Sequence, residues 1–450
     1  MSLLARMRSA IRVADTARPT GVVYRSTGLL IESVGPPARI GEKCLLYPAE
    51  NRPPIVCEVV GFNEEHLLLM PFEELKDIGA GSRVESVGGQ MTVPVGEAML
   101  GRVLDGLAQP MDGKGPIPAQ RQYPVNGDPP PALSRRKIQE VLPLGVRVLD
   151  GLVTCGVGQR LGIFAGPGVG KSSLLGMIAR NTKADVNVIA LIGERGREVG
   201  EFLERDLGPD GLQRSVVVVA TSDQPPVLRM RGAQVATAIA EYFRDLGRNV
   251  LLMMDSVTRF AWAQREVGLA TGEPPTRNGY TPSVFAALPR LLERAGNSAT
   301  GSITALYTVL VEGDDMNDPV ASTVRATLDG HVVLSRRLAQ MGHYPAVDVL
   351  DSVSRVMPHI CTPEHLMMAQ EFRAAIAAYR ESEDLLNLGA YVPGTNPTLD
   401  RAITLKQPID ILLRQTPQEA SSFEDTLTAM EEILSVPQPA VAATVPGKGP

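Results

Sequence analysis

The chain has 450 residues, of which 44% are hydrophobic and 21% are charged, a composition typical of a globular protein with two or three domains. Its formal net charge of −6, from 44 basic and 50 acidic residues, argues against nucleic acid as the main partner, because such proteins usually carry a basic excess. The sequence contains no secretory signal and no apolar run of the roughly 18 residues that span a membrane, so we expect a cytoplasmic protein. Its four cysteines include no CxxC pair, and we therefore expect neither a zinc site nor a disulfide framework.

Residues 1–18 predict a short amphipathic helix within an N-terminal segment of residues 1–20. Apolar side chains recur on one face, with arginines around them, and Pro19 ends the pattern. An isolated helix of this length is marginal in water, so we expect a partner protein or anionic lipid to order it. The alternative is a frayed terminus without a role. The apolar face consists of Leu4, Met7, Ile11 and Ala14.

The remaining chain divides into a small β-barrel, an α/β domain and a helical domain. Short apolar runs separated by Gly, Pro and Asn turns predict the barrel at residues 21–95. Strand-like runs that alternate with helical stretches predict a parallel or mostly parallel sheet at residues 96–360, with a connecting loop region at 101–131. The predicted strands are RLGIFA, VNVIALIG, SVVVVAT, NVLLMMD and SITALYTVLV.

The C-terminal part reads as helical from residue 361 to 435. Thr362 is a plausible N-cap and Pro363 fits the first helical position. An apolar stripe follows at helical spacing, formed by Met368, Phe372, Ile376 and Tyr379. Residues 436–450 are of low complexity, and we expect them to be disordered.

The segment FAGPGVGKSS has the pattern of a phosphate loop, GxxxxGK followed by Ser or Thr, except that Ala165 replaces the first glycine. Its glycines let successive backbone N–H groups point at phosphates, Lys171 reaches the β and γ oxygens, and Ser172 offers a magnesium ligand. A flexible glycine-rich turn is the alternative, which a strand before and a helix after disfavour. The predicted nucleotide-binding residues are Ala165, Gly166, Pro167, Gly168, Val169, Gly170, Lys171, Ser172 and Ser173.

Two carboxylates follow predicted strands of the same sheet. Glu194 comes directly after LIG, where a carboxylate at the carboxyl end of a strand could orient the water that attacks a γ-phosphate. Asp255 ends NVLLMMD, the pattern of a Walker B strand whose aspartate holds magnesium. Each has an ordinary alternative, a helix-start glutamate or a loop aspartate, and each gains weight from the phosphate loop.

The segment GHYPAVDVLDSVSR is ambiguous from residue chemistry. Tyr344 could stack on a base, and Arg355 could stabilise charge on the γ-phosphate of a neighbouring subunit. Residue chemistry alone favours an ordinary loop with a surface arginine.

Six segments together resemble the rotary-type hexameric ATPases, the family that includes the catalytic subunits of F- and V-type ATP synthases. Within it the chain is most similar to the type III export ATPases, and among these to the flagellar branch, over roughly residues 20–405. The resemblance implies an N-terminal β-barrel, a central α/β RecA-like P-loop ATPase domain and a helical C-terminal domain. The segments are AGPGVGKSS, LIGERGREV, MMDSVTRFAWAQREVGLATGEPP, GYTPSVFAALPRLLERAG, YTVLVEGDDMNDP and GHYPAVDVLDSVSR.

The same resemblance implies roles for individual residues. Glu194 would be the catalytic carboxylate, supported by Lys171, and Arg355 would act across the subunit interface. Arg195 and Arg259 would lie close to the γ-phosphate. The resemblance also implies that Tyr344 packs against adenine, that Ser172 and Asp255 hold Mg²⁺, and that the loop 271–283 faces the centre of the ring.

The family further implies an ATP-hydrolysing motor, with ATP and Mg²⁺ as cofactors, that releases export substrates from chaperones, unfolds them and delivers them to a membrane gate. The implied partners are a homohexameric ring, a central stalk protein, chaperone–substrate complexes, a stator protein bound through residues 1–18, and anionic lipid. The ring would sit at the cytoplasmic face of the inner membrane, without nucleic acid.

Four alternatives remain. The motifs barely separate a flagellar ATPase from that of a virulence injectisome. An ATP synthase catalytic subunit is disfavoured because SEDLLNLGAYVPGTNP lacks an acidic lever segment. A Rho-like RNA translocase is disfavoured because the barrel has few aromatics and no basic stripe. A non-catalytic ring subunit should have lost Glu194.

Overall fold

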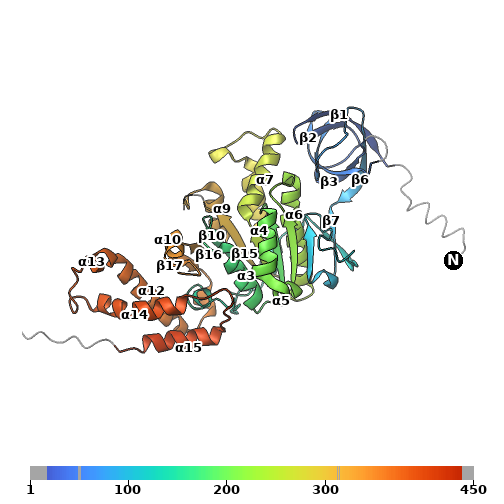
Figure 1. The fold of residues 1–450 in the computed structure, drawn as a ribbon. Coiled ribbons are helices and arrows are strands. Elements are labelled where there is room, and N and C mark those ends of the chain that lie inside the picture. Colours follow the sequence, from blue (N-terminus) through green and yellow to red (C-terminus); the bar gives the residue numbers. More distant parts are fainter. Residues whose placement is uncertain (1–17, 49–51, 312, 314, 438–450) are drawn as a thin grey trace, which may run out of the picture.

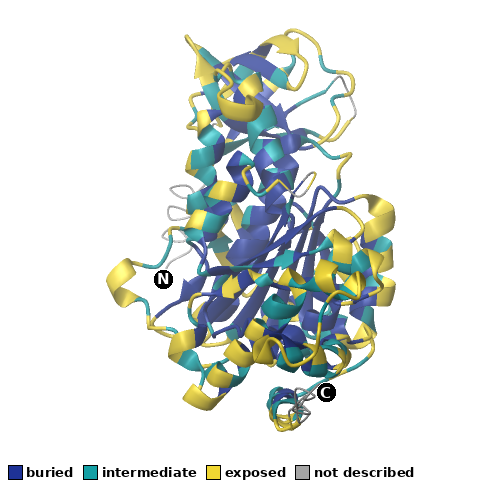
Figure 2. Cartoon of the chain, turned by 90° about the vertical axis from the view of Figure 1, so that its left-hand side faces the viewer, coloured by how far each residue is buried: buried dark blue, intermediate teal, exposed yellow. Residues whose placement is uncertain are grey.

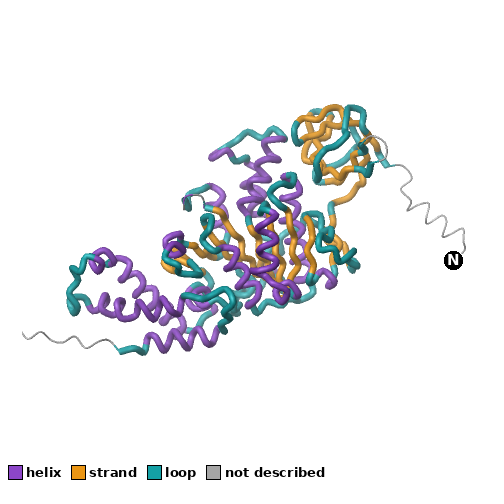
Figure 3. The backbone as a smooth tube through the Cα atoms, viewed as in Figure 1, coloured by secondary structure: helices purple, strands orange, loops and turns teal. Residues whose placement is uncertain are grey.

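The computed structural model describes residues 18–437 apart from 49–51, 312 and 314. Within them, a β-barrel lies at one end, an α/β domain in the middle and a helical domain at the other end (Figures 1 and 3). This architecture confirms the predicted fold class. The helix predicted for residues 1–18, all but its last residue, and most of the tail predicted at 436–450 lie outside the described residues.

The N-terminal barrel consists of antiparallel strands whose alternate side chains point inward. Its interior is closed by fully buried residues such as Ile31, Leu69 and Val84, and the free thiols of Cys44 and Cys57 face each other across two strands. The strands are β1 (Thr20–Thr27), β2 (Leu30–Val34), β5 (His66–Pro71), β4 (Ile55–Asn63), β3 (Glu42–Leu46) and β6 (Arg83–Gln90), and β6 pairs with β1 to close the barrel.

The barrel strands end at Gln90, whereas the sequence placed the domain boundary at 95. The next strand, β7 (Thr92–Val95), pairs with β9 (Arg121–Pro124), and its valines are buried in the core of the α/β domain. A buried ion pair between Glu58 of the barrel and Arg231 fixes the two parts to each other. The apolar side chain of Phe72 packs at the same contact.

The central domain is built on one mostly parallel sheet. Its described strands follow the order β17 (Val347–Ser354), β16 (Gly330–Leu334), β10 (Arg160–Ala165), β15 (Ser302–Leu310), β13 (Asn249–Asp255), β11 (Val186–Ile192), β12 (Ser215–Ala220) and β8 (Arg102–Asp105). Edge strand β17 and the short β14 (Gly296–Asn297) are antiparallel to their neighbours. The carboxyl ends of β10, β11 and β13 therefore meet at one edge, where ligands of such sheets bind.

Helices cover both faces of this sheet, which explains the continuous apolar runs of its strands. Val188 and Ala190 of β11 point into one core, whereas Ile189 and Leu191 point into the other. The strands are accordingly buried between outer layers that carry the exposed residues (Figure 2). One layer contains α6 (Pro226–Asp245), α7 (Val257–Ala270), α8 (Pro282–Leu292) and α9 (Pro319–Thr327), and the other contains α2 (Arg147–Leu152), α3 (Lys171–Asn181) and α5 (Gly208–Gln213).

The structure contains strands that the sequence did not predict, among them β9 and the two-residue β14. β8 lies within 101–131, where the sequence predicts loops, and β17 lies within 342–355, where residue chemistry favours a loop. The short strand β16 was also missed. β8 has four residues, and only parallel pairing with β12 makes it a strand. β16 and β17 likewise depend on pairing with each other and with β10.

The C-terminal domain is helical, as predicted. The Thr362 side chain caps α12 (Pro363–Glu381) by accepting the His365 N–H at 3.3 Å, and Pro363 occupies the first turn. Phe372, from the predicted apolar stripe, is fully buried. The further helices of this domain are α13 (Glu383–Asn387), α14 (Pro397–Leu413) and α15 (Phe423–Leu434). Two short helices, α10 (Arg336–Gln340) and α11 (Met357–Ile360), precede α12 in the chain.

Candidate nucleotide site

The phosphate loop joins β10 to α3. Gly168 and Gly170 adopt φ values of 76° and 90°, which side chains disfavour, and the tight turn that results aims backbone N–H groups at one point in front of α3. Helix α3 begins at Lys171, and its residues from Leu174 to Ala179 are buried. This packing fixes the position of the helix N-terminus, whose positive dipole end faces the loop. This local structure is that of an anion-binding loop.

Lys171 connects the loop to both predicted carboxylates. Its Nζ lies 2.5 Å from Oδ1 of Asp255 and 3.4 Å from Oε1 of Glu194. Asp255 ends β13 and Glu194 follows β11, so the parallel sheet brings all three side chains to one edge. Asp255 also accepts a 2.7 Å hydrogen bond from the hydroxyl of Thr308 on β15. The tertiary structure thus unites the residues that the sequence proposed separately.

Glu194 is held in an environment that disfavours its charge. Burial, followed by the negative charge of Asp255, raises its pKa to about 7, although the Lys171 ammonium and the Arg259 guanidinium act in the opposite direction. Burial lowers the pKa of Lys171, but Asp255 and Glu194 outweigh that effect and raise it above its usual value. A carboxylate poised near neutral pH suits a group that orients and polarises water.

A cleft of about 400 Å³ opens in front of these side chains. Arg195, on the exposed surface at its rim, pairs with Glu198 at 3.4 Å. Arg259 lines the cleft too, with its guanidinium carbon 5.1 Å from the centre of the Trp262 ring. The cleft is lined by Gly166, Pro167, Gly168, Gly170, Lys171, Ser172, Ser173, Glu194, Arg195, Glu198, Arg259, Trp262, Leu310 and Val311.

Some predicted loop residues are structural neighbours of the cleft rather than part of its wall. Ala165 and Val169 are buried beneath the loop, at 1% and 2% exposure. Gly193 lets the chain pass Arg259, since a Cβ at Gly193 would lie 2.8 Å from the Cβ of Arg259. Ser172 is exposed in the first turn of α3, so its hydroxyl is open to the cleft.

Tyr344 lies beside the same loop. A Cβ at Gly170 would come within 3.2 Å of two carbons of the Tyr344 ring, so the ring packs on the loop backbone. The Tyr344 carbonyl accepts the Gln415 N–H at 2.9 Å, which ties this position to the helical domain. With 43% of its surface exposed, the aromatic ring has a free face.

Arg355 is the one predicted site residue that the fold places elsewhere. It follows β17, whose antiparallel direction carries it to the start of β16 and β10. The phosphate loop is at the other end of β10. Arg355 is exposed, and its guanidinium donates to the Leu328 carbonyl at 3.3 Å. It therefore takes no part in the nucleotide cleft of its own chain.

Sequence reasoning missed Thr308, Glu198 and Trp262. Thr308 is one of several hydroxyl residues in the run SITALYTVLV, so the sequence carries no signal that singles it out. Trp262 is the single tryptophan of the chain and stands one helical turn after Arg259. These spacings gain meaning only once β13, β15 and α7 are packed together.

A phosphate loop at the switch from strand to helix, with two strand-end carboxylates beside it, defines a P-loop nucleotide-binding protein. Comparisons with known proteins specify the class further. The nucleotide-binding domain of the ATP synthase alpha/beta family matches residues 145–354, and the T3SS EscN ATPase C-terminal domain matches residues 361–432.

Whole-chain relatives agree with these domain matches. The flagellum-specific ATP synthase of Bacillus subtilis is 53% identical over 426 residues, which cover 94% of this chain and 97% of the relative. The type 3 secretion system ATPase of Xanthomonas euvesicatoria is 51% identical, with 92% and 94% covered. The assembled ATPase EscN from the type III secretion system of enteropathogenic E. coli superposes with a TM-score of 0.86 at 46% identity, covering 92% of this chain and all of that one.

The chain therefore belongs to the type III export ATPases, within the ATP synthase alpha/beta family, and is an ATP-binding enzyme that hydrolyses ATP. Over the part that the structure describes, no helix is both long and apolar enough to cross a membrane.

Proposed function

We propose that the protein is the ATP-driven motor of a flagellar type III export apparatus. The observation that carries the proposal is Lys171, held between Glu194 and Asp255 at the mouth of the phosphate loop. Flagellum-specific relatives at 53% and 50% identity favour the flagellar branch. In this role hydrolysis releases export substrates from their chaperones and feeds them, unfolded, to a membrane gate.

The geometry suggests how each side chain acts. The loop N–H groups and Lys171 bind the β- and γ-phosphates, and Lys171 exchanges its carboxylate partners for phosphate oxygens as ATP enters. Glu194 is then freed to accept a hydrogen bond from a water molecule and to orient it toward the γ-phosphorus. Arg259, whose charge already acts on Glu194, lies close enough to favour the ionised carboxylate. Arg195, exposed at the rim, exchanges Glu198 for the negative charge of the γ-phosphate.

Ser172 and Asp255 fit a magnesium site. A hydroxyl in the first turn of α3 and a strand-end carboxylate are hard oxygen donors, and Mg²⁺ is usually held by one or two carboxylates together with substrate phosphates. When bound, Mg²⁺ neutralises charge on the β- and γ-phosphate oxygens. The two residues would hold it while Thr308 orients the Asp255 carboxylate.

The position of Arg355 favours a ring of identical subunits. Its guanidinium is exposed at the end of β10 opposite the phosphate loop, so any nucleotide cleft in which it acts belongs to a neighbouring copy. EscN, the related ATPase, is known as an assembled protein and in complex with its central stalk EscO. We infer a homohexamer here, with a stalk protein inside the ring, the loop 271–283 facing it and Tyr344 packed against adenine.

Residues 1–18 complete the proposed assembly at the cytoplasmic face of the inner membrane. We propose that their apolar face binds a stator protein and that their arginines add contact with anionic lipid. Deleting residues 2–18 should leave ATP hydrolysis intact and abolish co-purification with the stator. Unchanged binding of the stator to the truncated chain would remove this part of the proposal.

Glu194→Gln tests the chemical role. The substitution keeps the shape but removes the charge, so turnover should fall by ~10²–10⁴-fold. ATP affinity should persist, because Lys171 and the loop N–H groups remain. Glu201→Gln is the matched control, since Glu201 is an exposed carboxylate of α4 (Gly196–Glu201) that pairs with Arg197. Near-normal turnover of Glu194→Gln would contradict the assignment.

The injectisome ATPase stays the second candidate, because the relative from Xanthomonas euvesicatoria is 51% identical. Expression in two strains, one without its flagellar ATPase and one without its injectisome ATPase, separates the two. Restored motility supports the flagellar motor, whereas restored injectisome secretion without motility supports the alternative.

A further inference from the structure

A chain of ion pairs lies beneath Arg355 at the start of β10, outside the nucleotide cleft. Arg160 binds Asp329 side-on, with Nε 3.1 Å from Oδ2 and Nη2 3.2 Å from Oδ1. The backbone N–H of Arg160 donates to the same carboxylate at 3.0 Å. Nη1 of Arg160 lies 2.6 Å from Oε1 of Glu293. The Arg160 side chain is 13% exposed, whereas the side chains of Asp329 and Glu293 are 27% and 40% exposed, so water screens these pairs in part.

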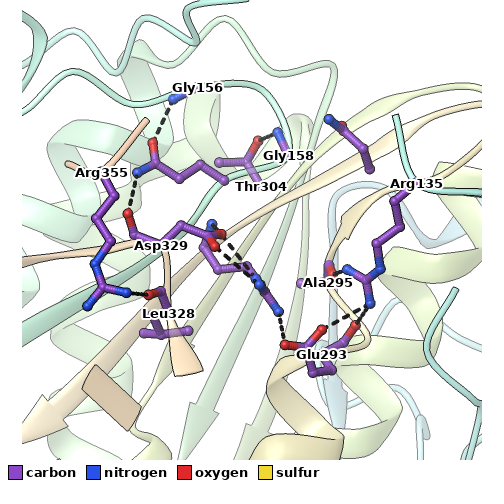
Figure 4. A network of polar contacts seen from close by, with 12 residues as sticks. Arg135, Gly156, Gly158, Glu293, Ala295, Thr304, Leu328, Asp329 and Arg355 are labelled. Atoms are coloured by element: carbon purple, nitrogen blue, oxygen red, sulfur yellow. Dashed lines mark hydrogen bonds and ion pairs between the residues drawn. The ribbon is translucent and has the colours of Figure 1, made fainter. Parts of the chain in front are cut away.

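These ion pairs fix the segment to which Arg355 is hydrogen-bonded. The Asp329 carbonyl accepts the backbone N–H of Arg355 at 3.0 Å, and the Leu328 carbonyl accepts its guanidinium at 3.3 Å (Figure 4). The two acceptors are thus the carbonyl groups of adjacent residues, and Arg160 fixes the side chain of the second, Asp329. A planar guanidinium bound through two nitrogens fixes direction as well as distance.

The other side of Arg355 is fixed too. Gln159 donates through Nε2 to Ser354 Oγ at 3.0 Å and to the Asp329 carbonyl at 3.3 Å. Gly330 lets β17 approach closely, because a Cβ there would lie 2.4 Å from the Val353 carbonyl oxygen. Strand β17, which Arg355 directly follows, is thus held in place by the hydrogen bond from Gln159 and by its close packing against β16 at Gly330.

At its far end the ion-pair chain reaches α8. Glu293 directly follows α8 and is held by Arg135, whose Nη2 lies 3.2 Å from Oε2 of Glu293, while Nη1 donates to the Ala295 carbonyl at 3.0 Å (Figure 4). The contacts run without a break from the end of α8, through Arg160 and Asp329, to Arg355. None of these residues lines the nucleotide cleft of this chain.

We propose that Arg160, Asp329 and Glu293 are positioning residues for Arg355, and that they set the direction in which its guanidinium leaves the sheet toward the neighbouring subunit. The inference rests on the proposed action of Arg355 between subunits. A group that acts on a transition state must be placed closely, and a shift of ~1 Å can cost ~10²-fold in rate.

Asp329→Asn is the first test, because it removes the charge that Arg160 binds and keeps the size of the side chain. We expect kcat to fall by ~10–10²-fold, and the KM for ATP to stay within about twofold because the cleft of the same chain is untouched. Asp112→Asn is the matched control. It breaks a similar pair, in which Arg102 binds Asp112 at 2.7 and 2.9 Å, and should leave kcat unchanged.

Mixed rings distinguish positioning of Arg355 from general damage. Asp329→Asn subunits keep their phosphate loop, and Lys171→Ala subunits keep a well-placed Arg355, so mixing the two should restore part of the turnover. In an Arg355→Ala background, Asp329→Asn should cause no further loss. Glu293→Gln serves as a second, milder variant with the same expected pattern should Asp329→Asn fail to fold.

The outcomes separate the two proposals. If Arg355→Ala turns over normally, the action of Arg355 between subunits is wrong, and the inference falls with it. Suppose instead that Arg355→Ala is inactive and is rescued in mixed rings. The positioning role alone is then overturned if the Asp329→Asn and Glu293→Gln variants are fully active, or if mixed rings do not rescue them.

Discussion

The two ends of β10 carry buried charges that are bonded in opposite ways. At the carboxyl end, the ammonium of Lys171 makes single contacts of 2.5 and 3.4 Å with two carboxylates. At the amino end, the guanidinium of Arg160 donates two hydrogen bonds to Asp329 and forms an ion pair with Glu293 through its third nitrogen. An ammonium is a compact charge that changes partners easily, whereas a guanidinium in a side-on pair keeps one geometry.

The difference matches what each end has to do. Phosphates must displace the partners of Lys171 at every turnover, so loosely specified contacts are an advantage there. In the proposed ring, Arg355 enters the cleft of another subunit, and its direction would have to be maintained through the cycle. Exchangeable charge thus marks the end of β10 where a ligand enters, and rigidly bonded charge marks the end proposed to face a neighbouring subunit.

The largest effect should come from Arg355→Ala. An arginine that stabilises charge on a transferred phosphoryl group contributes ~10³–10⁵-fold in rate, so most of the turnover of the assembled protein should disappear. Nucleotide affinity of the isolated chain should stay unchanged, because Arg355 is remote from the loop of its own chain. Steady-state ATPase assays and fluorescent-nucleotide titrations measure the two quantities.

Mixing Arg355→Ala with Lys171→Ala subunits sharpens that prediction. Each variant alone should be inactive, but some interfaces of mixed rings pair an intact loop with an intact arginine, so partial turnover should return. A mixture as inactive as its parents, under conditions in which mixed rings form, would show that the two ends of β10 do not act on one nucleotide.

The next effect concerns pH at the carboxyl end. Because the pKa of Glu194 is raised to about 7, the protonated form grows as the pH falls below 7, and kcat/KM for ATP should drop by up to about tenfold per pH unit. The residual rate of Glu194→Gln should lack this step. A wild-type profile that is flat between pH 6 and 8 would contradict the assignment of Glu194.

The same shift affects stability with a defined sign. Between its usual pKa of 4.5 and about 7, the folded protein keeps a proton on Glu194 that the unfolded chain releases. The contribution of Glu194 to the free energy of unfolding therefore decreases as the pH rises through this window. Glu194→Gln should remove that part of the pH dependence in denaturant titrations.

The smallest effect should come from Tyr344→Ala. Stacking of a base on an aromatic ring contributes ~1–3 kcal/mol, and the half-exposed ring should lie at the lower end, so the KM for ATP should rise about fivefold with little change in kcat. Tyr344→Phe keeps the ring and should behave like the wild type. An equal loss in kcat would place Tyr344 in the chemistry instead.

Much of this molecule follows from local patterns. The runs that became β10, β11, β12, β13 and β15 were recognisable because strands covered on both faces are apolar throughout. The phosphate loop was recognisable because few sequences place glycines, a lysine and a hydroxyl between a strand and a helix. The cap at Thr362 was equally local, since one side chain satisfies N–H groups within its own helix.

Other features could not be read in this way. β8, β16 and β17 are short, and they are strands only because longer neighbours offer hydrogen-bonding partners. Thr308 orients Asp255 across two strands, and no spacing in the sequence announces that contact. For GHYPAVDVLDSVSR residue chemistry pointed to a loop, and only the resemblance to a family assigned roles to Tyr344 and Arg355.

By itself, then, the sequence determined the elements whose stability and chemistry are local: the apolar strands, the helix caps and the loop for phosphates. Only the tertiary structure decided which side chains act together, because charges interact over a few ångströms and the fold alone sets those distances. It brought Lys171, Glu194 and Asp255 to one end of β10. It carried Arg355, through the reversed direction of β17, to the other end, beyond the reach of its own nucleotide cleft.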